Sequence, residues 1–255
     1  KFNWKNSHRE RFDRAREIPA EALYGVQTLR GIENFSISKF RLSEYPLFIK
    51  GLAITKMAAA MANFELGLLT VEQKDAIIAA CGEIIDGKHH DQFPVDMIQG
   101  GAGTTTNMNA NEVIANRALE LMGHERGEYQ YCSPNDHVNC SQSTNDAYPT
   151  AIHIGMYFKH LQLLPHLEEL IASFRKKGEE FSRIIKMGRT QLEDAVPMTL
   201  GQTFNGFASI LQDEIAHLNE AAADFLVVNM GATAIGTGIC AEPGYAEKCI
   251  AALRR

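Results

Sequence analysis

Residues 200–225 read LGQTFNGFASILQDEIAHLNEAAADF, and this stretch decides the fold. Its apolar side chains recur at three- and four-residue intervals, close to a heptad pattern, which places them on one face of a helix of about four heptads. They are Leu200, Phe204, Phe207, Leu211, Ile215, Leu218, Ala222 and Phe225. The polar face is thin, so the helix is predicted to need more than one neighbour.

A second long stripe precedes this one, between residues 150 and 186. Its members are Leu164, Leu167, Leu170, Ile171, Phe174, Phe181, Ile184 and Ile185. Pro165 falls inside the stripe and is expected to kink the helix or mark a break. The intervening MGRTQLEDAVP (187–197) is a polar connection. The sequence predicts an antiparallel pair of long helices in a bundle, with apolar faces that other subunits or further sequence must cover.

Shorter elements are predicted before the stripes. A helix rich in Ala and Met covers Leu47 to Leu66. Thr70-Val-Glu-Gln73 has the form of a capping box and begins another helix, for which Gly87 is a stop signal. The alternation of apolar and polar residues in Phe35–Phe40 predicts a short strand.

The prediction for the whole chain is a mainly α fold. A small, mostly helical N-terminal domain with a short β element covers residues 1–146, and residues 147–255 hold the first, incomplete part of a long-helix bundle domain. The final stretch, EPGYAEKCIAALRR (242–255), begins a helical pattern without a closing turn. This indicates a truncated chain or a fragment of a longer one.

Composition excludes several classes of function. The 255 residues carry a net charge of −6, whereas a nucleic-acid binder usually shows a basic patch. No run of 18 apolar residues predicts a membrane span, and the polar start at residues 1–16 does not resemble a signal peptide. Five cysteines at irregular spacing do not suggest a disulfide framework, so a cytoplasmic location is expected.

Three polar clusters interrupt the apolar patterns. Gly100–Asn107 is a Gly-rich turn that leads into a predicted helix, and a helix start attracts anions such as carboxylates. Ser141–Asp146 places hydroxyls and amides at the start of the first long helix, which suits a carboxylate for the same reason. Gly188–Gln191 lies between the two long helices. Ordinary turns, helix caps and a plain loop are the alternative interpretations of these clusters.

Other chemistry is poorly supported. The Gly-rich turn lacks the Lys-Ser/Thr of a P-loop and the third glycine of a dinucleotide fingerprint. Cys132, His137 and Cys140 do not have a usual zinc spacing, so no metal is expected. No organic cofactor is expected either.

Four motifs together resemble a known family. They are GGAGTTTNMNANEV (100–113), SPNDHVNCSQSTNDAYPT (133–150), MGRTQLEDAVPMTLGQ (187–202) and NMGATAIGTG (229–238). In this order and spacing they are similar to the fumarase/aspartase superfamily, most of all to its ammonia-lyases. The segments EIPAEALYGVQTLRGIENFSIS (17–38) and DQFPVD (91–96) agree, so the resemblance covers nearly the whole chain from about Arg14.

The resemblance implies a homotetramer whose long helices form a common core, with each active site built from three subunits. It implies reversible elimination of ammonia from L-aspartate to give fumarate, without an organic cofactor. Thr104 matches a contact to a substrate carboxylate, and Ser143, Thr144 and Asn145 match contacts to the carboxylate and amino groups. Thr190 and Gln191 match the part contributed by a neighbouring subunit. Hydratases of the family usually carry His where Gln191 stands.

Two departures from the family pattern matter. The general base of the family is a serine in a GSSxMPxKxNP motif, which this chain lacks, so the resemblance predicts no catalytic residue here and an inactive fragment. Fumarases also have a peripheral anion site with His at the position of Ser133, which puts that site in doubt. Two alternatives stay open: a fumarate hydratase, and a non-catalytic helical fragment that only assembles.

Overall fold

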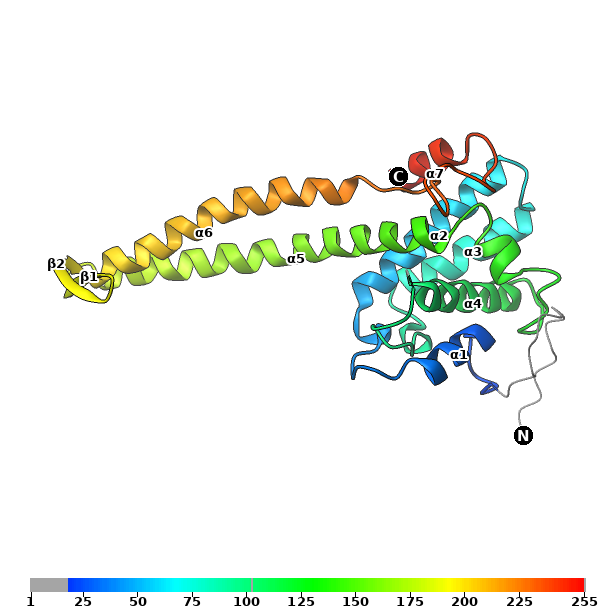
Figure 1. Ribbon diagram of the computed structural model, residues 1–255, viewed down its shortest axis with the longest axis horizontal. Helices are drawn as coiled ribbons and strands as arrows, with labels where there is room; N and C mark the ends of the chain where they lie inside the picture. The colour runs from blue at the N-terminus through cyan, green and yellow to red at the C-terminus, as the bar shows by residue number, and fades with distance from the viewer. Residues whose placement is uncertain (1–17, 102, 255) are drawn as a thin grey trace. The chain divides into compact units, whose positions relative to one another are not determined.

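The computed structural model describes residues 18–101 and 103–254, so the polar start at residues 1–16 lies outside it. The described residues form helices and one two-stranded sheet, which confirms the mainly α prediction (Figure 1). Two compact units divide the chain. The first contains residues up to 155 and from 228 onward, and the second contains residues 156–227.

Helices packed around an apolar centre build the first unit. They are α1 (Val26–Asn34), α2 (Pro46–Glu65), α3 (Val71–Ile85), α4 (Thr104–Leu121), the first turns of α5 (Thr144–Glu180) and α7 (Tyr245–Leu253). Short turns η1 (Leu42–Glu44), η2 (His90–Gln92) and η3 (Pro134–Val138) connect them. Helix α2 packs against α3 and α7, and α4 packs against α1 and α3.

Helix α2 is the central helix of this unit and confirms the prediction for residues 47–66. A side chain at Gly51 would place its Cβ 2.2 Å from the carbonyl oxygen of Ala151, so glycine permits the close approach of α5. The length of α2 and its mean hydropathy of 1.3 would suit a membrane span. Most of its residues are nevertheless buried by the helices around it, as in the core helix of a folded domain.

The capping box at the start of α3 is confirmed. The backbone N–H of Gln73 donates to Thr70 Oγ1, and the Gln73 side chain accepts from the Thr70 N–H. The strand predicted for Phe35–Phe40 is wrong. The N–H groups of Ile37 and Ser38 donate to the Asp96 carboxylate at 2.9 and 2.7 Å, so a side chain satisfies this backbone in place of a neighbouring strand.

The second unit holds the rest of α5, α6 (Leu200–Ala223) and the end turn η4 (Asp224–Leu226). The two long helices run antiparallel, as predicted (Figure 1). Phe174 lies between Phe204 and Phe207 with ring centroids 6.0 and 5.6 Å apart. Helix α5 continues through Pro165, so the break offered as one outcome there does not occur. Pro165 is on an exposed face, where solvent can satisfy the carbonyl group that loses its partner.

The polar connection contains a β-hairpin that the sequence did not predict. Strands β1 (Ile185–Thr190) and β2 (Glu193–Thr199) pair antiparallel, with Thr190 opposite Glu193. Most side chains of both strands are exposed, so no alternation of buried residues marks them. The compact units also differ from the predicted domains at 1–146 and 147–255. The division falls inside α5, and residues 228–254 return to the first unit because α7 packs on α2.

Candidate functional site

The Gly-rich turn ends at Gly103, the N-cap of α4, and Thr104 is the exposed first residue of that helix. Gly103 has φ 89°, and an added Cβ would lie 2.3 Å from the Tyr148 ring. Gln99 accepts a hydrogen bond from the Thr106 N–H at 2.9 Å, so one free donor of the helix start is satisfied. The turn therefore packs directly onto α5 and presents Thr104 beside the contact.

The start of α5 is held by a buried carboxylate. Asp146 Oδ1 accepts from the Ser143 N–H at 2.9 Å, while Oδ2 accepts from the N–H groups of Gly231 and Thr233 at 3.1 and 2.9 Å. Asn145 Nδ2 donates to the Ala234 carbonyl at 2.8 Å. The NMGATAIGTG segment thus folds back on the SQSTND segment, although the two are more than 80 residues apart in the chain.

A buried lysine lies behind these helix starts. Lys56 of α2 has no exposed surface, and its Nζ donates to Asn107 Oδ1, Asn139 Oδ1 and Gln142 Oε1 at 2.7, 2.9 and 2.9 Å. Burial lowers the pKa of Lys56 to about 7, and the nearby carboxylate of Asp146 opposes that shift.

Asn107 links the lysine to a predicted site residue. Its Nδ2 donates to Thr144 Oγ1 at 3.2 Å and to Asn139 Oδ1 at 3.1 Å. The starts of α4 and α5 therefore share one hydrogen-bond network, which begins at Lys56 and ends at the Thr144 hydroxyl.

A hollow of about 600 Å³ lies at the starts of α4 and α5. It is lined by Met97, Ile98, Gln99, Gly101, Gly103, Asn145, Tyr148, Pro149 and Ile152. Of the predicted site residues, Asn145 lines it directly. Thr104 follows the lining residue Gly103 in the chain, and Thr144 precedes Asn145. The first unit therefore brings the Gly-rich turn and the start of α5 to one concave surface of a size that suits a small ligand.

Thr190 and Gln191 belong to the second unit, at the tip of the hairpin. Both are exposed, and Gln191 and Leu192 form the turn with φ of 49° and 71°. Residues other than Gly rarely adopt such angles, and backbone strain of this kind concentrates at functional sites. The hollow of the first unit is built without them.

Comparison with known proteins places this geometry in a family. Residues 14–255 match a protein family described as Lyase. The chain belongs to this lyase family. It is 59% identical over 230 residues to an aspartate ammonia-lyase of Pseudomonas canavaninivorans, covering 90% of this chain and 48% of that protein. It is 54% identical to the aspartate ammonia-lyase of Escherichia coli K12 over 92% of this chain and 49% of that one.

Solved structures agree. A fumarate lyase:delta crystallin from Brucella melitensis bound to cobalt matches with a TM-score of 0.90 and 54% identity, over 93% of this chain and 52% of that one. A class II fumarase from Schistosoma mansoni matches with a TM-score of 0.83 and 37% identity, over 92% and 50%. Membership of the fumarase/aspartase superfamily is confirmed. The lyase-family chain spans about half the length of the relatives it matches.

Sequence reasoning missed the interior of the site in this lyase-family chain. Lys56 and Asn139 lie outside the predicted polar clusters, and Asn107 and Gln142 lie inside them but were assigned no role. One signal was available: a lysine within the otherwise apolar GLAITKMAAAMA (51–62) has no obvious surface to face. A buried lysine needs partners, and amide-bearing residues are frequent in the motifs nearby.

The segment expected to match a peripheral anion site is closed by internal bonds. Ser133 Oγ donates to Asp136 Oδ2 at 2.9 Å, and the Ser133 N–H donates to His137 Nδ1 at 2.7 Å. Gln73 Nε2 lies 3.2 Å from His137 Nε2. Among residues 18–101 and 103–254, no three His, Cys, Asp or Glu side chains are grouped to hold a metal ion.

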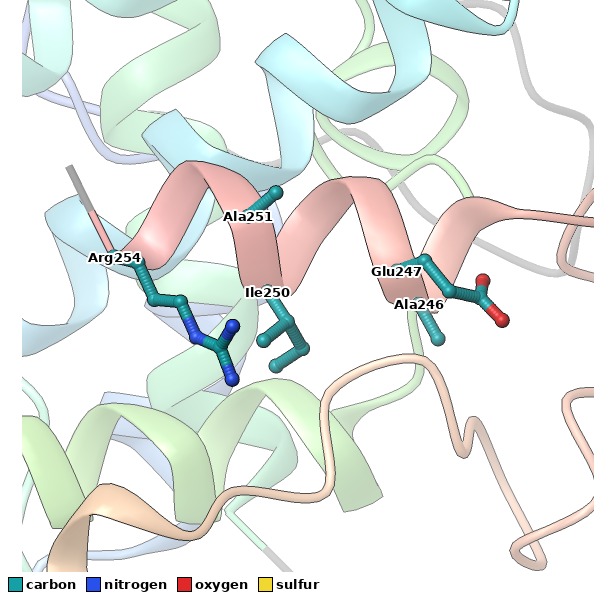
Figure 2. Close-up of a pocket in the computed structure, with 5 residues that line it drawn as sticks. All are labelled: Ala246, Glu247, Ile250, Ala251 and Arg254. Carbon is teal, nitrogen blue, oxygen red and sulfur yellow. The ribbon is translucent and has the colours of Figure 1, made fainter.

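A second hollow, of about 400 Å³, lies along α7. It is lined by Ala246, Glu247, Ile250, Ala251 and Arg254, and Figure 2 shows Ile250 and Arg254 on one side of the helix and Ala251 on the other. None of the predicted site residues lines it. It presents one acidic and one basic side chain on an otherwise apolar helix face, without the grouped neutral donors found at α4 and α5.

Proposed function

We propose that the full-length protein is an ammonia-lyase that converts L-aspartate reversibly into fumarate and ammonia. The observation that carries the proposal is the meeting of two helix starts, rich in hydroxyl and amide groups, on one hollow. Helix starts favour carboxylates, and L-aspartate has two of them. The identity of 54–59% to proteins named aspartate ammonia-lyase supports the same activity.

The proposed reaction removes a proton from the carbon next to the β-carboxylate and passes through an aci-carboxylate intermediate. Negative charge builds on that carboxylate, so groups that bind it more tightly in the transition state accelerate the reaction. We assign this role to Thr104, Ser143 and Thr144. Preorganised donors of this kind typically contribute roughly 3–4 kcal/mol each to lowering the barrier.

The remaining residues would orient the substrate. Asn145 uses its Nδ2 for Ala234, which leaves the amide oxygen to accept a hydrogen bond from a substrate ammonium group. Gln191 is assigned to the same amino group, and Thr190 to the second carboxylate. Because these two lie in the second unit, we propose that a neighbouring copy of the chain supplies them.

We also propose that the full-length protein is a homotetramer, in the cytoplasm. Leu161, Leu163, Phe207 and Ile210 of the long helices are exposed in the single chain, and a bundle shared between subunits would cover them. All five cysteines are free, in keeping with a reducing compartment.

The test is an assay of the purified full-length protein with L-aspartate, following fumarate by its ultraviolet absorbance. Fumarate formation from aspartate, with no turnover of malate, is expected. Turnover of malate without aspartate would establish a fumarate hydratase. We further propose that residues 1–255 alone produce no fumarate, because the chain lacks the base-carrying motif expected from the family.

A further inference from the structure

The three acceptors around Lys56 favour its charged form over the neutral amine and indicate its role. All three are side-chain amide oxygens, from Asn107 on α4 and from Asn139 and Gln142 in the segment before α5. An ammonium group has three N–H donors and no acceptor, so this set satisfies every proton of the charged lysine. The other ionisable groups that face it are Asp146, Cys81 of α3 and Cys249 of α7. Burial raises the pKa of both thiols, so they stay neutral, and Asp146 is the one facing carboxyl group among these three.

The lysine also decides which way the Asn107 amide points. A group that only donates requires the amide oxygen of Asn107 on its side, which turns Nδ2 toward Asn139 and Thr144. Thr144 Oγ1 therefore accepts from Asn107 rather than donating to it. The hydroxyl proton of Thr144 is consequently left to donate to another group.

We propose that Lys56 is a positioning residue for the lyase reaction, acting through Asn107 to keep the Thr144 hydroxyl as a donor to the substrate carboxylate. The inference rests on the proposed function. Lys56 touches no substrate itself, because it is fully buried behind α4 and α5. Its positive charge and the direction of the hydrogen bonds both act on the same hydroxyl. The expected effect is on the transition state, so kcat should fall more than KM rises.

The experiment is a double-mutant cycle in the full-length protein. Lys56→Met, a similarly long apolar side chain, is expected to lower kcat by about tenfold or more, because the Asn107 amide is no longer held. In a Thr144→Val background, which removes the hydroxyl, adding Lys56→Met should change kcat by less than about twofold. Equal effects of Lys56→Met in both backgrounds would overturn the proposal.

Two further variants separate positioning from folding. Asn107→Asp keeps an acceptor for Lys56 but turns a second oxygen toward Thr144, and this oxygen captures the hydroxyl proton. The variant should therefore lower kcat by about tenfold or more, as expected for Lys56→Met. It tests the proposal independently if the Lys56→Met protein does not fold. Thr55→Val is the matched control, since Thr55 is buried next to Lys56 and its hydroxyl donates to the Gly51 carbonyl of the same helix at 2.8 Å. It should leave kcat within about twofold of wild type. A tenfold loss of kcat in Thr55→Val, or an unchanged kcat in Asn107→Asp, would reject the role proposed for Lys56. The lyase proposal would still stand in that case, because it depends on turnover by the wild-type protein. A wild-type protein that makes no fumarate from aspartate would overturn both.

Discussion

Glu112 offers a sharp test of how the first unit is held together. This buried residue of α4 accepts four hydrogen bonds from the start of α1. Oε2 receives the Gly25 N–H, the Thr28 N–H and the Thr28 hydroxyl at 2.8, 3.0 and 2.7 Å, and Oε1 receives the Gln27 N–H at 2.8 Å. A distant side chain therefore supplies the cap that the N-terminus of α1 lacks locally.

Two substitutions of Glu112 should lower the free energy of unfolding by different amounts. Glu112→Ala leaves the buried Gly25 and Thr28 donors without an acceptor and opens a cavity, so a loss of about 3–5 kcal/mol in the free energy of unfolding is expected. Glu112→Gln can keep its oxygen at the position that receives three bonds. Only the Gln27 N–H then faces an amide nitrogen, and Gln27 is exposed, so the expected loss is about 1–2 kcal/mol.

Hydrogen exchange of the full-length protein measures this locally. Protection of the Gly25 and Thr28 amides from exchange should be highest in the wild type, lower in Glu112→Gln and lowest in Glu112→Ala. Amides in α3 should change less. Glu125→Gln, an exposed change beyond the end of α4, is the control and should leave all of them unchanged. Equal loss in the Gln and Ala variants, or unaltered exchange at Thr28 in Glu112→Ala, would refute the capping argument.

Three more outcomes are expected. Thr144→Val should lower kcat for aspartate by about 10²–10³-fold in a steady-state assay, because one donor to the developing charge is lost; unchanged turnover would remove its assigned role. Glu83→Gln should lower the free energy of unfolding by about 1–2 kcal/mol at pH 7, since Arg117 holds the pKa of Glu83 at about 2, below its unfolded value, in a pair partly open to solvent. That difference is present above about pH 4.5 and should vanish as the pH falls through about 2, as denaturation at several pH values can check. Gly103→Ala should cost about 1–3 kcal/mol and raise KM for aspartate, because its φ of 89° disfavours a Cβ that would also strike the Tyr148 ring; an unshifted melting temperature would contradict this.

Elements set by a local sequence pattern were predicted, and elements set by contacts between distant residues were not. Helices α2, α3 and α6 were predicted close to their bounds, because burial of one face leaves a period in the sequence. The failure at residues 35–40 has a different cause: Asp96, almost 60 residues away, satisfies that backbone. The hairpin carries neither a buried face nor the Asn-Gly type of turn that marks hairpins in sequence, and its tip relies on positive φ at Gln191 and Leu192.

The residues of the candidate site were also predictable only where a local motif marks them. Motifs indicated the hydroxyl and amide residues near the surface, but the partners of Lys56 are spread along the chain, with Asn107 51 positions away and Gln142 86. No local pattern connects such residues, since only the packing of α2 against its neighbours brings them together.

The candidate donors at the starts of α4 and α5 are neutral, and the proposed reaction gives a physical reason for this. A dicarboxylate held by arginine pairs would bind tightly in the ground state, and binding that does not increase in the transition state adds nothing to kcat. In the proposed reaction, hydroxyls such as those of Thr104 and Thr144 strengthen their bonds as charge accumulates on the substrate. The positive charge of Lys56 lies one amide behind Thr144, where it polarises the donor without contacting the ligand. Under the proposed mechanism, placing the cation in the interior favours the transition state over the bound substrate or product, which gives the fully buried Lys56 a role in the site.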